Sequence, residues 1–96
     1  IINNHVLGMV RQWQTLYYGE RYSFTVLDDQ VDFVKLAESY NILGIRVTDE
    51  KDIEAAFEQA AANKNRPTLI EFMVSCELDV YPMVPGGKAL TDMLFG

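Results

Sequence analysis

The stretch that decides the fold opens the chain and reads Ile1-Ile2-Asn3-Asn4-His5-Val6-Leu7-Gly8-Met9-Val10-Arg11-Gln12-Trp13. Two isoleucines end an apolar run, two asparagines favour a turn, and Met9, Val10 and Trp13 share one face at helical spacing. This order predicts a corner from a strand into a helix. Ligands of open α/β sheets bind at such corners, because helix amides and loop carbonyls are available there. The sequence therefore predicts its binding site in these residues.

Two helices are predicted in the first half of the chain. The first runs from about Val6 to Tyr18 and is stopped by Gly19. The range 20–27 alternates too weakly for a strand and is expected to be irregular. The second helix begins at a cap provided by Asp28 or Asp29. Its predicted inner face consists of apolar residues at helical spacing, namely Phe33, Leu36, Ala37 and Tyr40.

The second half of the chain predicts a strand, a helix and another strand. The strands cover Leu43–Val47 and Thr68–Val74, and the helix between them is capped by Thr48 or Asp49. The inner face of this helix is predicted from its apolar residues, namely Ile53, Ala56, Phe57, Ala60 and Ala61. Strands that alternate with helices imply a parallel sheet with right-handed crossovers. We therefore expect an α/β fold in three layers, with helices on both faces of the sheet.

The chain is expected to have two unequal portions. Residues 1–75 form the α/β portion, and residues 76–96 form an irregular tail, because prolines and glycines interrupt it. The sequence begins in what reads as the end of a buried strand. We therefore expect the carboxyl-terminal piece of a longer polypeptide.

Composition excludes several functional classes. The chain has 96 residues and a net charge of −6, which argues against general affinity for nucleic acid or for anionic membranes. No run approaches the roughly 20 apolar residues that cross a bilayer. The single cysteine, Cys76, excludes an internal disulfide and is predicted to be a buried thiol. We expect a soluble protein from a reducing compartment.

From the residues alone, the candidate site has competing interpretations. Asn3 and Asn4 favour a simple turn, although an asparagine oxygen is also a hard neutral donor suited to Mg²⁺. Gly8 costs a helix about 1 kcal/mol relative to alanine, which indicates either a tight helix start or close approach of a ligand. His5 has no carboxylate beside it in the sequence, so it is not predicted to be a catalytic base.

Several segments together carry a family resemblance: Asn3-Asn4, Leu7-Gly8-Met9-Val10, Gln12-Trp13, Tyr17-Tyr18, Arg21-Tyr22-Ser23, Asp32-Phe33-Val34-Lys35-Leu36-Ala37-Glu38, Gly44-Ile45-Arg46-Val47 and Tyr81-Pro82-Met83-Val84-Pro85-Gly86-Gly87. They resemble the catalytic subunit of acetolactate synthase (acetohydroxyacid synthase), a thiamine diphosphate enzyme. The resemblance covers essentially the whole chain. It implies the C-terminal part of the thiamine diphosphate-binding domain, which is the third and last domain in that family.

The resemblance also implies a cofactor site. Mg²⁺ would be held by the side chain of Asn4, by the backbone carbonyl of Val6 and by an upstream aspartate. The Gly-Asp-Gly segment that supplies this aspartate is not in the chain. The residues implied to line the cofactor are Asn4, His5, Val6, Leu7, Gly8 and Met9.

A substrate and inhibitor channel is implied as well, lined by Met9, Val10, Trp13 and Gly86. Trp13 would favour a longer second 2-oxo acid by apolar contact, and in the family the same residue contacts sulfonylurea herbicides. The segment Met83–Gly87 would fold over the channel mouth and exclude water.

The implied reaction is the decarboxylation of pyruvate and transfer of the two-carbon unit to a second 2-oxo acid, in branched-chain amino acid biosynthesis. The glutamate that activates the cofactor lies in an earlier domain of a neighbouring subunit, so this piece has no catalytic residue and is expected to be inactive alone. FAD would bind outside it. The family further implies a homodimer or homotetramer, a small regulatory subunit, and a cytoplasmic location, or a plastid in a plant.

Two alternatives stay open. The chain could belong to another thiamine diphosphate decarboxylase or carboligase, such as a glyoxylate carboligase or pyruvate oxidase. Trp13 and the segment Met83–Gly87 favour acetolactate synthase over these. A free-standing acidic α/β interaction module without chemistry fits the composition equally well.

Overall fold

A computed structural model describes residues 1–27 and 31–96 and contains one small parallel sheet. The strands are β1 (Ile2–Asn3), β2 (Leu43–Val47) and β3 (Thr68–Met73), in the spatial order β1-β3-β2. The α-helices are α1 (Gly8–Tyr17), α2 (Phe33–Ser39) and α3 (Ile53–Ala62). Two 3-10 turns, η1 (Glu50–Asp52) and η2 (Leu90–Asp92), complete the regular structure of the described residues. The predicted order of strands and helices is confirmed.

The three strands end at a common edge of the sheet. β3 is central, and its residue Phe72 lies opposite Ile2 of β1 and Val47 of β2. All pairings are parallel, so the strands run in the same direction and their carboxyl ends meet at this level. The loops that leave β1, β2 and β3 therefore start beside one another, which is where α/β proteins place ligand sites.

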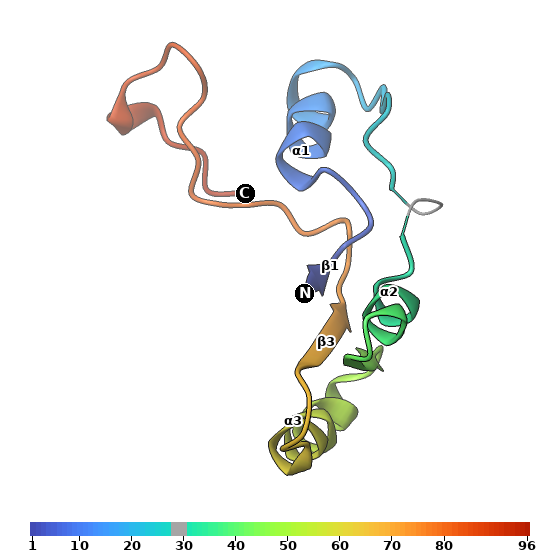
Figure 1. Ribbon diagram of the computed structural model, residues 1–96. Helices are drawn as coiled ribbons and strands as arrows, with labels where there is room; N and C mark the ends of the chain where they lie inside the picture. The colour runs from blue at the N-terminus through green and yellow to red at the C-terminus, as the bar shows by residue number, and fades with distance from the viewer. Residues whose placement is uncertain (28–30) are drawn as a thin grey trace.

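Helices cover both faces of the sheet. Successive residues of a strand point to opposite faces, so the sheet can pack against helices on both sides. On one face, Gly44 of β2 lies so close to Val34 of α2 that an added Cβ would come within 3.0 Å of it. On the other face, the ring of Phe57 in α3 lies 5.8 Å from that of Phe72. Figure 1 looks nearly along the strands and shows α2 and α3 on either side of them. The predicted three-layer α/β architecture is confirmed.

The first helix begins at Gly8, so the predicted start at Val6 is wrong. The reason is a long-range contact: Val6 pairs with Val26 in an antiparallel bridge. The amide of Leu7 donates to the Thr25 carbonyl at 2.9 Å, and this holds the chain extended just before the helix. The predicted stop is confirmed, because the helix ends at Tyr17 and Gly19 has a φ of 59°.

The caps of the other helices are aspartates. Asp28 and Asp29 lie outside the described residues, and the residue at the N-cap of α2 is Asp32, whose carboxylate accepts from the Lys35 amide at 3.1 Å. Of the two candidates before the third helix, Asp49 caps η1, which leads directly into α3.

The core is small and part of the predicted apolar faces is exposed. Ala37, Val47 and Ala56 are the buried apolar side chains of the described residues. Tyr40, predicted to face inward, is 74% exposed, and Phe57 is 56% exposed. A sheet of three strands is too narrow to cover both helices. Apolar surface of this extent is typical of a contact with other protein.

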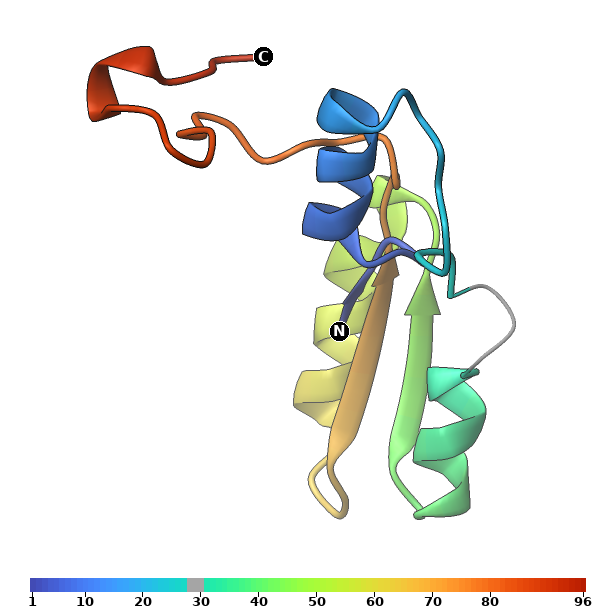
Figure 2. The same ribbon diagram turned by 90° about the horizontal axis from the view of Figure 1, so that it is seen from above.

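The tail gives the molecule an elongated shape. After β3 the chain passes α1 and then extends away from the sheet (Figure 2). Met83 and Leu94 form an antiparallel bridge within this tail. The radius of gyration is 17.4 Å, against about 13 Å for a compact domain of this length. Of the helices that the structure describes, none is long and apolar enough to cross a membrane.

Candidate functional site

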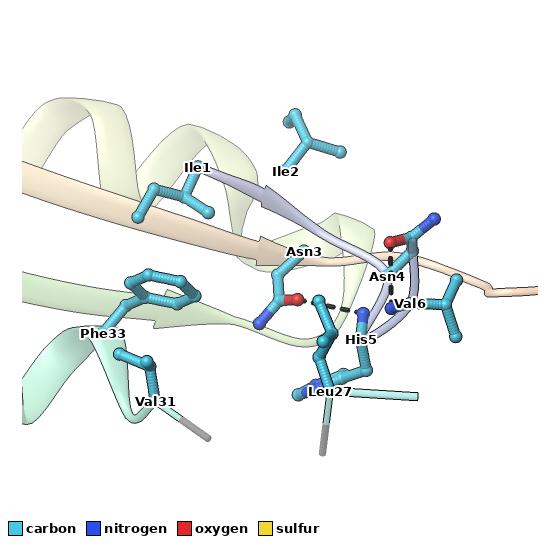
Figure 3. A pocket seen from close by; sticks show the side chains of 9 residues that line it. All are labelled: Ile1, Ile2, Asn3, Asn4, His5, Val6, Leu27, Val31 and Phe33. Atoms are coloured by element: carbon cyan, nitrogen blue, oxygen red, sulfur yellow. Dashed lines mark hydrogen bonds between the residues drawn. The ribbon is translucent and has the colours of Figure 1, made fainter. Parts of the chain in front are cut away.

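The corner after β1 is a tight turn held by its own asparagines. The side-chain oxygen of Asn3 accepts from the amide of His5 at 2.9 Å, and that of Asn4 accepts from the amide of Val6 at 3.3 Å. Between them, His5 adopts a left-handed φ of 57°. Few residues other than glycine have a positive φ, although asparagine, aspartate and histidine adopt it more often than the rest. The turn interpretation of the asparagine pair is therefore confirmed. Figure 3 shows that Asn3 points toward Leu27 and Phe33, whereas Asn4 points away from them.

Pockets lie on both sides of this turn. One pocket of about 350 Å³ stands at the end of β1, and its lining residues are Ile1, Ile2, Asn3, Asn4, His5, Val6, Leu27, Val31 and Phe33 (Figure 3). A second pocket of about 370 Å³ is lined by Asn4, His5, Val6, Arg11, Tyr22, Val26, Val74 and Cys76. Asn4, His5 and Val6 belong to both linings. The prediction that Cys76 is buried is wrong, because it is partly exposed in the second pocket.

The turn presents polar main-chain groups that the described residues leave unbonded. The carbonyl of Val6 accepts no hydrogen bond from them. The hydrogen bonds beside the Val6–Val26 bridge use other carbonyls, those of His5 and Thr25. Leu7 occupies the cap position of α1, and its side chain makes no capping hydrogen bond. The amides of Gly8, Met9 and Val10 likewise donate to no acceptor in the described part of the chain.

Gly8 is the first residue of α1, in agreement with a tight helix start. An added Cβ at this position would lie 3.1 Å from the side-chain nitrogen of Asn4. The absence of a side chain at Gly8 therefore lets the Asn4 amide lie against the helix start. The close approach that we observe is made by Asn4, and approach of a ligand to Gly8 stays a prediction.

A buried carboxylate in β3 binds the first asparagine of the turn. Glu71, in the middle of β3, is 1% exposed. One of its oxygens accepts from the Asn3 side-chain amide and the other from Nε of Arg46, both at 2.7 Å. A second guanidinium nitrogen of Arg46 donates to Asp32 at the start of α2, also at 2.7 Å. Strand β1, strand β2 and helix α2 are thus tied to one side chain of β3.

The charges of this network stabilise one another. Burial raises the pKa of the Glu71 carboxyl, but hydrogen bonds from Asn3 and Arg46 and the charge of Arg46 outweigh it, so that its pKa lies below the ordinary value. The pKa of Asp32 is lowered chiefly by the hydrogen bond from the Lys35 amide, which with the hydrogen bond and charge of Arg46 outweighs the opposing effect of desolvation. Sequence reasoning missed this network. Its one available signal was a glutamate within an apolar strand, Thr68–Val74, parallel to a strand that carries an arginine.

The predicted channel residues lie mostly on one exposed face of α1. Trp13 is 51% exposed, and Met9 and Val10 are exposed to a similar extent. Val10 and Trp13 line a pocket of about 380 Å³, together with Gln14, Tyr18, Arg21 and Ser23. Met9 and Gly86 do not line it. Apart from its immediate chain neighbours, a Cβ added at Gly86 would meet no atom of the described residues within 4 Å, so the structure does not bring this residue against Val10 and Trp13. The tail that carries it extends away from the sheet (Figure 2).

The buried side of α1 is hydrogen-bonded to the tail, residues 76–96. Gln12 is 1% exposed, and its side-chain amide donates to the Val80 carbonyl and accepts from the Val80 amide, each at 3.0 Å. Sequence analysis did not assign a role to Gln12, because its partner is 68 residues away.

Comparison with known proteins places the chain. Residues 1–72 match the family described as "Thiamine pyrophosphate enzyme, C-terminal TPP binding domain". The chain belongs to this family. The parallel α/β fold is consistent with a domain of this family, and the α/β assignment from the sequence is confirmed.

Similar proteins narrow the family further. The chain is 48% identical over 93 residues to an acetolactate synthase of Mycobacterium leprae, which covers 93% of the chain and 15% of that protein. It is 40% identical to the acetolactate synthase large subunit of Haemophilus influenzae, over 97% of the chain and 16% of that protein. It is 39% identical to the acetolactate synthase isozyme 2 large subunit of Escherichia coli, over 98% of the chain and 17% of that protein. The resemblance to acetolactate synthase is confirmed, and the chain spans about a sixth of the length of these relatives.

Proposed function

We propose that this chain is part of an acetolactate synthase that uses thiamine diphosphate and Mg²⁺ to decarboxylate pyruvate and to transfer the two-carbon unit to a second 2-oxo acid, in branched-chain amino acid biosynthesis. Family membership and the named relatives support the assignment. The observation that carries it is the corner after β1. There the Asn4 side chain and the unbonded Val6 carbonyl stand beside an uncapped helix start.

The residues present fit a magnesium diphosphate. Mg²⁺ binds hard oxygen ligands, and in proteins these usually come partly from the protein and partly from the phosphate groups of a ligand. Asn4 and Val6 each offer one neutral oxygen, and the Asn4 oxygen accepts a single hydrogen bond from the described part of the chain, a long one of 3.3 Å. No group of three or more histidine, cysteine or acidic side chains that could hold a metal occurs among residues 1–27 and 31–96. The diphosphate itself and a carboxylate from elsewhere would complete the coordination.

The start of α1 fits the anionic part of the cofactor. Unbonded amides and the positive end of a helix dipole are a common site for diphosphates. The amides of Gly8, Met9 and Val10 have this arrangement within the described residues. Thiamine diphosphate, when bound, supplies the electron sink for decarboxylation and two-carbon transfer. The role of His5, Leu7 and their neighbours is to bind and orient it.

The exposed apolar face of α1 is proposed to form one wall of the substrate channel. Met9, Val10 and Trp13 would contact the side chain of the second 2-oxo acid, and the tail would contribute Gly86. A difference of one methylene in such a pocket changes the free energy of binding by about 1–3 kcal/mol. Trp13, with its large flat ring, is the residue expected to favour the longer acceptor.

The rest of the protein is proposed to supply what these residues lack. The upstream aspartate and the activating glutamate would come from other domains or from a second subunit, so residues 1–96 alone are expected to be inactive. A homodimer or homotetramer with a small regulatory subunit, and FAD bound elsewhere, would follow the family. Exposed Phe57, Trp13 and Tyr17 support burial against other protein.

The test uses the full-length protein. Calorimetric titration with thiamine diphosphate should release heat when Mg²⁺ is present and much less when it is removed by chelation. A non-catalytic interaction module would show no metal-dependent heat, which would contradict the proposal. Product analysis with pyruvate and 2-oxobutyrate then checks the channel. Trp13→Leu should lower the share of acetohydroxybutyrate severalfold, whereas Tyr40→Leu, on the far end of α2, should leave the product ratio unchanged.

A further inference from the structure

We propose that Glu71 is a positioning residue for the metal-binding turn, and that it acts through Asn3 to hold Asn4 and Val6 in place for the magnesium diphosphate. The inference rests on the proposed function and adds a residue to it. Glu71 does not line either pocket beside the turn. Its effect must therefore pass through the side chain that it binds.

The burial of Glu71 shows that its contacts are specific. A carboxylate that is 1% exposed needs a partner for each oxygen, because burying an unpaired charge is strongly unfavourable. Asn3 occupies one oxygen and Arg46 the other, each at 2.7 Å. Both oxygens of Glu71 are therefore engaged, one on β1 and one on β2, and these two contacts fix the orientation of the side chain.

This arrangement determines which way the Asn3 amide faces. A carboxylate only accepts hydrogen bonds, so the nitrogen of Asn3 must point to Glu71. The oxygen of Asn3 is then directed to the amide of His5, which it accepts at 2.9 Å. Without Glu71 the Asn3 amide could rotate and present its nitrogen to the His5 amide, and these two donors would repel each other.

The His5 contact in turn shapes the metal site. His5 has a left-handed φ of 57°, a conformation that a histidine keeps only when its surroundings hold it. Asn4 precedes this residue and Val6 follows it. The relative placement of the Asn4 side chain and the Val6 carbonyl therefore depends on the conformation of His5, and through Asn3 on Glu71.

The experiment measures binding of Mg²⁺ to the full-length protein at saturating thiamine diphosphate, by calorimetry, with the melting temperature of each variant recorded in parallel. In Glu71→Gln one of the two donors must face the new amide nitrogen. We expect the Kd for Mg²⁺ to rise by about 10- to 100-fold, as is usual when a residue that orients a metal ligand is changed. The matched control is Asp32→Asn. It also removes one carboxylate charge beside Arg46, yet it leaves the Glu71–Asn3 contact intact, and its Kd should stay within about twofold of the unaltered protein.

A double variant tests the route. If Glu71 acts through Asn3, Glu71→Gln combined with Asn3→Ala should bind Mg²⁺ no more weakly than Asn3→Ala alone. An unchanged Kd in a folded Glu71→Gln variant overturns the inference, and so do additive losses in the double variant. If Glu71→Gln does not fold, Asn3→Ala decides, because it spares the Glu71–Arg46 pair; a Kd unchanged by Asn3→Ala overturns the inference. Failure of the unaltered protein to bind thiamine diphosphate with Mg²⁺ overturns the proposed function itself.

Discussion

Two corners of the same sheet edge begin at the same level and are built differently. After β2, Asp49 accepts from the Lys51 amide at 3.1 Å and pairs with the Lys51 side chain at 2.8 Å, so the helix start is capped by its own residues. After β1, Leu7 gives α1 no side-chain cap, and the asparagines bond within the turn instead. The pocket after β2 is also smaller, about 170 Å³ against about 350 Å³. Both corners lie at the carboxyl edge, and the main-chain groups left unbonded by the described residues distinguish the first corner as the candidate site.

The largest effect is expected from giving the first corner the cap that the second already has. Leu7→Asp should raise the melting temperature of the cofactor-free protein, because an N-cap contributes about 1 kcal/mol. The same carboxylate would repel the diphosphate by about 3 kcal/mol, which corresponds to roughly 100-fold weaker binding. Calorimetry and thermal melts of the full-length protein measure both.

An uncharged substitution at the same position separates the effect of the helix cap from the effect of the negative charge. Leu7→Asn offers a cap without the negative charge, so its affinity for thiamine diphosphate should fall less than that of Leu7→Asp. Equal losses in the two variants would show that the diphosphate does not lie near the start of α1.

Filling the space beside Asn4 should have the next largest effect. In Gly8→Ala the new methyl group would lie 3.1 Å from the Asn4 side-chain nitrogen and displace it by a few tenths of an ångström. Affinity for Mg²⁺ should fall about tenfold, as for other changes that misorient a metal ligand. Thermal stability should not fall, because alanine is the better helix residue. A loss of stability with unchanged Mg²⁺ affinity would mean that the helix start, and not Asn4, requires this glycine.

The second corner should respond in the opposite sense. Asp49→Ala removes the cap of η1 and should lower the melting temperature. The affinity for Mg²⁺ and thiamine diphosphate should stay the same. Weakened cofactor binding in this variant would contradict the contrast between the two corners.

The smallest expected effect is on the pH dependence of stability. The pKa of Glu71 is lower in the folded state than its ordinary value of 4.5. Its network therefore contributes in full above about pH 4.5, and this contribution is lost as pH falls through the lowered value. Glu71→Gln should flatten the fall in melting temperature below pH 4.5, measured against the unaltered protein. An equally steep fall in the variant would show that the carboxylate is not ionised and paired in the fold.

Periodicity and turn residues were enough to predict the order of the elements, the parallel sheet and the turn at Asn3 and Asn4. These features depend on neighbours in the sequence. The start of α1 was misplaced because Val6 pairs with Val26, which no local pattern reveals. The Glu71–Arg46 pair depends on the register of two strands, and the exposure of Tyr40 depends on how little sheet is available to cover it.

The residues of the candidate site could be predicted from the sequence, but the residues that hold them in place could not. Asn4, Val6 and Gly8 follow from the resemblance, and the structure gathers them at one corner. Gln12 and Glu71 could not be found in this way, since each bonds to a residue 68 positions away. Gly86 does not line the pocket beside Val10 and Trp13, so its place in the channel stays a prediction.

The central claim is that the side-chain oxygen of Asn4 helps to hold a magnesium diphosphate, and one comparison tests it directly. Binding of Mg²⁺ at saturating thiamine diphosphate is measured for the full-length protein, for Asn4→Ala and for Asn65→Ala, an exposed asparagine in the turn before β3. The account predicts that Asn4→Ala binds Mg²⁺ at least about tenfold more weakly and that Asn65→Ala binds it as the unaltered protein does. Equal affinity in all three proteins would contradict it.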